Sequence, residues 1–180
     1  MKHPELEKLA ELIRGKNKVD NEIAQVIGRP AQLGHAGEFI AAAIFDIDLN
    51  YSATEKGNDG YFRRGSMNVK TVNIKWYPKR ESGLDIKPSH IADFYLVLAG
   101  PKSSALSSRG GSRPWLIESV YLFDMRKLMD ELRSRGVKIG EATSMLEHSW
   151  NEAEIYPRHN AHYTISEEQK ILISLFKESA

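Results

Sequence analysis

The chain has 180 residues, with 25 Lys and Arg side chains against 24 Asp and Glu, and it contains no cysteine. The length suits one compact domain, and a hydrophobic fraction of 41% is typical of a globular protein rather than a disordered one. The absence of cysteine excludes disulfides, a thiol nucleophile and cysteine-ligated metals. No apolar run approaches the length of a membrane span, and the first residues are charged and amphipathic, unlike a signal peptide, so we expect a cytoplasmic protein without a membrane partner.

The near-neutral total hides an uneven distribution of charge. Residues 1–60 have 7 basic and 10 acidic side chains, residues 61–114 have 10 and 3, and residues 115–180 have 8 and 11. The three net charges are therefore −3, +7 and −3. Because a local positive field attracts anionic ligands, the central part of the chain predicts an anionic partner.

Helical patterns dominate the N-terminal part of the chain. Pro4 begins a first predicted helix that Gly15 ends, and a short second helix runs from about residue 20 to Ile27. A third helix is predicted from Leu33 to Phe45, where a run of three alanines favours close packing against a sheet.

Strand patterns follow the third helix. Strands are predicted at 47–53, 61–62, 70–77, 92–99 and 115–123, then a helix at about 124–135, irregular structure at 137–163 and a last helix after Ser166. We expect the Ser- and Gly-rich loop at 100–114 to be mobile. This order predicts an α/β (α+β) fold with one mixed sheet of about five strands flanked by helices. We assign one domain, with N-terminal helices at 1–30, a core at 31–136 and a C-terminal segment and helix at 137–180.

Four polar residues are positioned to act together. Asp59 lies in an Asn-Asp-Gly turn before a predicted strand, and Asn73 and Lys75 lie two residues apart on the next strand, so their side chains share one face. Glu38 lies on the preceding helix. Carboxylates and carbonyls bind hard cations, and a nearby lysine stabilises negative charge that develops on a phosphoryl group. The pattern therefore suits metal-assisted hydrolysis of a phosphodiester.

This arrangement of an aspartate followed by an Asn73-x-Lys75 pair resembles the PD-(D/E)xK nuclease superfamily. The stretch KGNDGYF…VNIKWYPKRESGLDI…ADFYLVLAGP is also similar to a little-characterised bacterial family placed in that superfamily, and the stronger resemblance covers residues 27–101. The resemblance implies a restriction-endonuclease-like core and Mg²⁺- (or Mn²⁺-) dependent cleavage of double-stranded DNA. Restriction-type enzymes often act as homodimers, so the resemblance makes a homodimer one possible assembly of this chain.

The resemblance assigns a role to each of the four residues. Asp59 matches the metal-binding aspartate, Lys75 the catalytic lysine and Glu38 the glutamate of the first helix. Asn73 stands where the superfamily has Asp or Glu, and Asn58 stands where it has proline. The expected metal ligands are therefore Glu38, Asp59 and Asn73, and the expected catalytic residues are these three with Lys75.

The departure at Asn73 leaves two readings open. In the first, Glu38 supplies the missing carboxylate and the site is active. In the second, the site is catalytically degenerate and the chain is a nucleic-acid-binding or protein-interaction module on the same fold. Taken singly, Asp59 also suits an ordinary turn, and Lys75 suits a solvated strand.

A basic stretch overlaps the same strand. Residues 61–80 contain no acidic side chain and interleave aromatic with basic residues, as a nucleic-acid-binding groove does. A solvated edge hairpin has the same composition. The candidate nucleic-acid-binding residues are Arg63, Arg64, Lys70, Lys79 and Arg80.

Two weaker motifs remain. Residues 20–42 have the helix, glycine turn and helix of a helix-turn-helix DNA-binding motif, but the second helix has few side chains that read bases. His159 and His162 have the spacing of a zinc-binding pair, but the sequence offers no evident third or fourth ligand, and structural or surface roles fit them better.

Overall fold

The computed structural model describes residues 3–50, 57–80, 82–89, 91–102 and 113–178. The described residues form a mixed α/β fold with five α-helices. The helices are α1 (Pro4–Ile27), α2 (Leu33–Phe45), α3 (Met125–Ser134), α4 (Glu147–Ala153) and α5 (Glu167–Ser174), with one 3₁₀ turn, η1 (Gly65–Met67). Most of the loop expected to be mobile, residues 103–112, and the end of the strand predicted at 47–53 lie outside the described residues.

The main sheet has six strands rather than the five that the sequence predicts. Its order is β1 (Ile47–Leu49), β2 (Gly60–Phe62), β3 (Thr71–Tyr77), β5 (Phe94–Ala99), β6 (Ser119–Asp124) and β8 (Glu154–Tyr156). β3 and β5 are parallel, and all other neighbours are antiparallel. A separate two-stranded ribbon joins β4 (Gly83–Leu84) to β7 (Thr143–Ser144).

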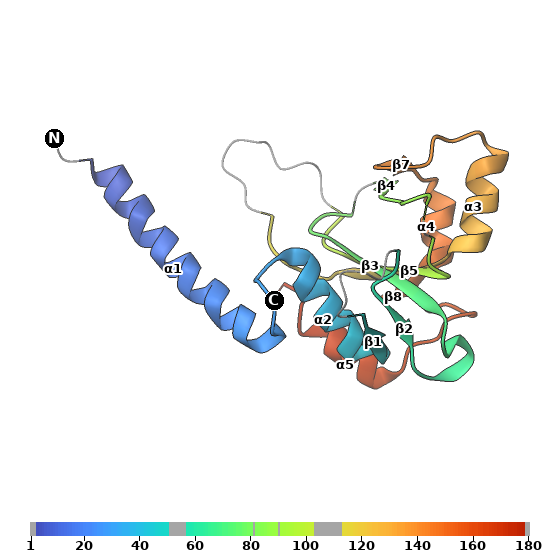
Figure 1. Cartoon of the computed structure of the whole chain (residues 1–180), viewed down its shortest axis with the longest axis horizontal. Helices are drawn as coiled ribbons and strands as arrows, with labels where there is room; N and C mark the ends of the chain where they lie inside the picture. The colour runs from blue at the N-terminus through green and yellow to red at the C-terminus, as the bar shows by residue number, and fades with distance from the viewer. Residues whose placement is uncertain (1–2, 51–56, 81, 90, 103–112, 179–180) are drawn as a thin grey trace.

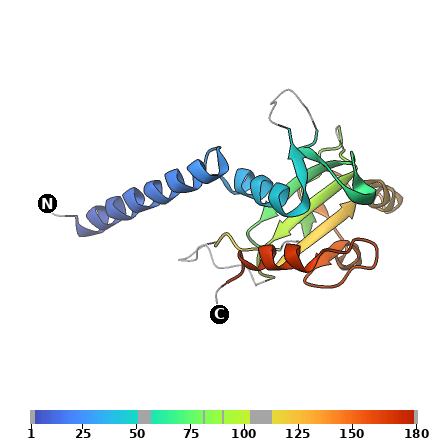
Figure 2. The ribbon, with the colours of Figure 1, turned by 90° about the horizontal axis from the view of Figure 1, so that it is seen from below.

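Helices cover both faces of the sheet (Figures 1 and 2). Val72, Ile74 and Trp76 of β3 point into a core that α2 and α5 close. The alternate residues of β3 point to the other face, where Tyr95 and Val97 of β5 pack with α3 and α4. The candidate site residues of β3 therefore lie on the face opposite α2.

The helix starts of α3 and α5 agree with the sequence. The Asp124 side chain accepts a hydrogen bond from the Lys127 amide at 3.1 Å, which caps α3. Ser166 and Gln169 form a reciprocal capping box at the start of α5. The Gln169 side chain also donates to the Ile44 carbonyl at 2.9 Å, which ties α5 to the end of α2.

The two predicted N-terminal helices are wrong: residues 4–27 form a single helix, α1. A glycine inside a helix costs about 1 kcal/mol relative to alanine, which does not end a helix when no breaker follows it. The helix ends instead at Gly28, whose φ of 67° is left-handed. α1 projects away from the sheet, as Figures 1 and 2 show.

The irregular structure predicted for 137–163 is also wrong, because this segment contains β7, α4 and β8. β8 has only three residues, too few for an alternating pattern to reveal, and it forms by pairing with β6. This pairing adds the sixth strand to the sheet.

Within the described part of the chain, no helix combines the length and apolar character needed to cross a membrane.

Candidate active site

Asp59 is held firmly where β2 begins. Its amide donates to the Val72 carbonyl at 2.9 Å, and its carbonyl accepts from the Asn50 amide at 2.8 Å. Its side-chain Oδ2 accepts from the Ile74 amide at 2.6 Å. Ile74 stands between Asn73 and Lys75, so the Asp59 carboxylate reaches the backbone of the predicted motif itself.

Gly60 allows β1 and β2 to approach each other closely. A Cβ at Gly60 would lie 2.2 Å from the Asp48 carbonyl oxygen of β1, so only glycine fits between the two strands. The glycine that follows Asp59 therefore lets β1 and β2 pair beside the site.

Asn73 and Lys75 share one face of β3, as the sequence predicts. Only 7% of Asn73 is exposed, and its Oδ1 has no hydrogen-bond partner among the described residues. Tyr95 lies beside Asn73 in the register between β3 and β5. A buried amide oxygen without a partner is costly, so this atom suits a ligand or an ordered water.

Glu38 of α2 is the fourth predicted residue, and its side chain is mostly buried. Its carboxylate is paired with the Arg29 guanidinium, which lies in the turn between α1 and α2. Glu38 is close enough to Asp59 for its charge to affect the ionisation of Asp59. Glu38 and Asp59 therefore lie near each other, but α2 covers the face of β3 opposite to the side chains of Asn73 and Lys75.

The ionisation of Asp59 reflects this environment. Burial raises the pKa of Asp59 above its ordinary value, and the negative charge of Glu38 raises it further. The Ile74 amide and the positive charges of Lys75 and Lys87 oppose that rise. A carboxyl group with a raised pKa next to a lysine is typical of functional sites as well as of structural networks.

Two tyrosines hold the segment after β4 against this face. The Tyr77 hydroxyl accepts from the Asp85 amide at 3.1 Å and donates to the Asp85 carboxylate at 3.3 Å, and burial raises the pKa of Tyr77 to about 12. The Tyr95 hydroxyl accepts from the Lys87 amide at 3.4 Å. Lys87 is thereby kept near Asp59.

Arg29, Lys87 and Tyr95 are the site neighbours that sequence reasoning missed. Each lies near the candidate site only because of tertiary contacts, and the sequence around them contains no motif that marks them. Arg29 pairs with a residue nine positions away, across a turn and the first turns of a helix. The Asn73–Tyr95 neighbourhood depends on the parallel register of β3 and β5.

The predicted basic residues do not gather into one unpaired surface. Arg63 lies 3.5 Å from Asp48, Arg64 lies 2.7 Å from Asp46, and Lys70 lies 3.5 Å from Asp93. Of the five candidates, Lys79 is the one for which the described residues provide no ion pair.

Arg80 differs from the other candidates because it is buried. Its guanidinium bonds Glu147 at 2.8 Å and lies 4.8 Å from the centre of the Trp150 ring. A buried, paired arginine stabilises the packing of α4 and is poorly placed to contact a nucleic acid.

The metal-binding potential of the site is limited. Among the described residues, no three His, Cys, Asp or Glu side chains come together in a way that could hold a metal ion. The donors at this site are two carboxylates and one amide oxygen. Mg²⁺ prefers oxygen ligands and usually keeps several waters, so such a donor set is compatible with it.

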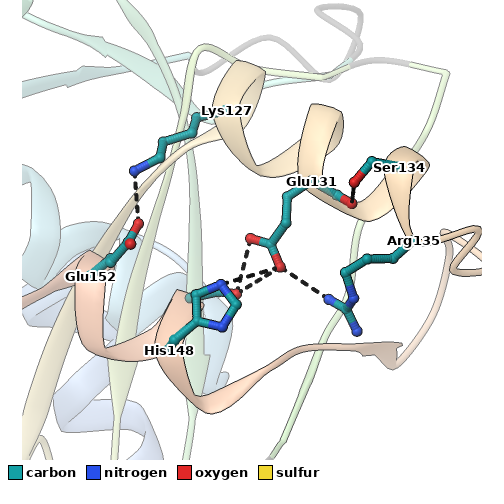
Figure 3. A network of polar contacts seen from close by, with 7 residues as sticks. Lys127, Glu131, Ser134, Arg135, His148 and Glu152 are labelled. Carbon is teal, nitrogen blue, oxygen red and sulfur yellow. Dashed lines mark hydrogen bonds and ion pairs between the residues drawn. The ribbon is translucent and has the colours of Figure 1, made fainter.

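Away from this site, a hollow of about 700 Å³ lies between α3, α4 and residues 158–163. Figure 3 shows polar contacts beside it: Lys127 bonds Glu152 at 2.7 Å, while Glu131 accepts from Arg135 at 3.0 Å and from Ser149 at 3.1 Å. The lining residues include four acidic side chains (Asp124, Glu131, Glu152 and Glu154) and two basic ones (Lys127 and Arg158). His159 and His162 line this hollow, with no metal-binding cluster among the described residues.

A comparison of the sequence with models of known protein families gives no match, and a comparison with curated proteins gives none either.

Proposed function

We propose that this chain is a restriction-endonuclease-like nuclease that hydrolyses phosphodiester bonds in DNA with Mg²⁺ or Mn²⁺. The observation that carries the proposal is the hydrogen bond from the Ile74 amide to the Asp59 carboxylate. This bond joins the aspartate to the strand segment that contains Asn73 and Lys75, with Glu38 close by. This proximity of residues that are distant in sequence supports the proposal.

The donor set supports a hard cation. Glu38, Asp59 and Asn73 would hold it, and the buried Asn73 Oδ1 is an acceptor without a partner among the described residues. When bound, such a cation polarises a phosphoryl oxygen and lowers the pKa of a coordinated water. Arg29 neutralises Glu38, so a cation must compete with Arg29 for this carboxylate.

The lysines would act on the substrate. Lys75 is adjacent to the bonded Asp59–Ile74 pair, where an ammonium group can orient water or stabilise charge on the reacting phosphate. Lys79 and Lys87 have no ion pair among the described residues, so they can attract phosphates of the DNA backbone.

The test is cleavage of supercoiled plasmid, linear duplex and single-stranded DNA by the purified chain with Mg²⁺ or Mn²⁺. We expect Lys75→Ala and Asp59→Asn to lose about 10²-fold or more of the activity. Lys8→Ala, which removes an exposed lysine of α1, is the matched control and should cleave like the wild type. An inactive wild type with both metals, or equal cleavage by Lys75→Ala, would overturn the catalytic proposal.

A second candidate function is a binding module without catalysis. The neutral Asn73 and the Arg29–Glu38 pair favour it, because both reduce the negative charge available to a cation. On this reading, DNA binding persists in EDTA and weakens as the salt concentration rises, and no metal restores cleavage.

A further inference from the structure

α1 is a long helix without a partner along most of its length. All 24 of its residues are described, and none is buried. Its exposed apolar side chains are Leu6, Leu9, Leu12, Ile13, Val19 and Val26. Since most helical stability in proteins comes from packing an apolar face, such a helix needs a surface to cover it.

We propose that α1 pairs in antiparallel orientation with α1 of a second copy of this chain. The helix contains a heptad repeat, the pattern of coiled coils. Its a and d positions, with spacings of three and four residues, are Leu6, Leu9, Ile13, Lys16, Asp20, Ile23 and Ile27. Five of these seven positions are apolar, and the two polar ones carry opposite charges.

The charged positions identify the partner as a second copy. In an antiparallel pair, a positions face d positions, so Lys16 of one copy lies opposite Asp20 of the other, twice by symmetry. The same alignment places Leu9 opposite Ile27 and Ile13 opposite Ile23. In a parallel pair, Lys16 would face Lys16 and Asp20 would face Asp20, which is repulsive.

The positions beside a and d on each helix also match in the same alignment. Leu12 lies opposite Val26, and Val19 lies opposite Val19 of the second copy, so the apolar stripe beside the a and d residues is covered too. On the other side, Ala10 lies opposite Ala24, and these small side chains allow the helices to approach closely. One register thus accounts for every exposed apolar residue of α1 beyond Leu6.

The shape of the chain allows this pairing. α1 projects away from the sheet (Figures 1 and 2), so an antiparallel pair carries the two sheets at its opposite ends. Lys16 and Asp20 already form an ion pair within one helix, and a second copy extends it to a network of four charges.

Charge reversal tests the pairing on the full chain, with mass measured by light scattering after size exclusion. We expect a dimer for the wild type, and at least a 10-fold higher dissociation constant for Lys16→Asp and for Asp20→Lys alone. An equimolar mixture of these two variants should form a heterodimer, because each charge then meets its opposite across the interface. In each variant, positions 16 and 20 carry like charges that still repel each other within one chain. Recovery of the dimer in the mixture therefore reports contact between chains.

Single cysteines test the orientation, because the natural chain has none. Val19→Cys should be joined to itself efficiently by a short bismaleimide. Leu9→Cys should not, because two copies of this residue lie about 27 Å apart along the antiparallel pair at 1.5 Å per residue. A wild type that stays monomeric at about 100 μM, or efficient coupling of Leu9→Cys to itself, would overturn the proposal.

Discussion

Asp59 is the residue whose environment departs most clearly from that of an ordinary surface carboxylate. Burial and Glu38 raise the pKa of Asp59, so the native chain holds this proton to a higher pH than the unfolded chain does. Between the unfolded pKa, near 3.8, and the higher native pKa, the native state binds more protons, and stability falls as pH rises. Ionised Asp59 therefore costs stability at neutral pH.

We expect Asp59→Asn to be more stable than the wild type at pH 7 and equally stable near pH 3.5. The asparagine keeps an oxygen that can accept from the Ile74 amide, and it removes the desolvated charge. Thermal unfolding followed by circular dichroism from pH 3.5 to 8 measures the difference. Asp130→Asn, at an exposed position of α3, serves as control and should show no such trend. A constant difference across this range would contradict the raised pKa.

Asn73→Asp addresses the residue that departs from the nuclease pattern. Without a divalent cation, a second carboxylate beside Asp59 in a buried position should lower the stability by about 1–3 kcal/mol. With Mg²⁺, the added ligand charge should raise the melting temperature of this variant more than that of the wild type, because ligands stabilise the state that they bind.

Differential scanning fluorimetry with EDTA or Mg²⁺ measures both effects of Asn73→Asp. Asn151→Asp, an exposed position on α4, provides the matched control. An equal response of all three proteins to Mg²⁺ would argue that Asn73 is not a metal ligand.

The elements were predictable where local chemistry determines them. The bounds of α2 agree with the prediction, and β3 and β5 differ from it by only one or two residues, because alternation and helix-forming composition are local properties. Asp124 and Ser166 cap α3 and α5 as expected. The helix around Gly15 and the short β8 were not predictable, because their structure depends on the energy of the whole helix or on pairing with β6.

The capping box of α5 makes a prediction at this scale. Ser166→Ala removes the hydroxyl that accepts from the Gln169 amide at 3.1 Å, and we expect it to cost about 1 kcal/mol. For a chain of this size that corresponds to about 2–4 °C in melting temperature. Ser134→Ala, whose hydroxyl donates to a carbonyl of its own helix, should change stability by less than about 0.5 kcal/mol. Equal melting temperatures for both variants would show that the cap contributes nothing.

The candidate site was predictable in part. The sequence brings Asp59, Asn73 and Lys75 together through strand periodicity, and the hydrogen bond from the Ile74 amide to Asp59 supplies the contact between the two segments. The sequence does not reveal that Arg29 pairs with Glu38, or that the Tyr95 hydroxyl binds the Lys87 amide. Those contacts depend on how α2 and the segment after β4 pack against the sheet.

For the molecule as a whole, the charge distribution differs from the one that the sequence indicates. The net charge of +7 over residues 61–114 is offset in space by acids from outside that segment, namely Asp46, Asp48 and Glu147. A count along the chain could not reveal this, because the end of α2, β1 and α4 bring these acids beside the basic residues. Lys75 and Lys87, which act on Asp59, and Lys79, two residues after β3, have no ion pair among the described residues.

We therefore expect a shallow salt dependence of DNA binding. If these three lysines contact phosphates, the logarithm of the binding constant should fall with the logarithm of the salt concentration with a slope of about −3. Fluorescence anisotropy of a labelled duplex between 50 and 300 mM KCl measures the slope. A slope of about −6 or steeper would mean that Arg63, Arg64 and Lys70 leave their acids and bind DNA as well.

The bond between Gln169 and Ile44 has a consequence for how the protein is made. Ile173 of α5 is fully buried in the core that Ile44 of α2 also lines, so this core cannot close until residues near 170 have left the ribosome. Until then, the apolar face of α2 and the strands beside it remain exposed to solvent, chaperones and proteases. The site carboxylates on α2 and before β2 should therefore reach their final positions only after α5 has been synthesised.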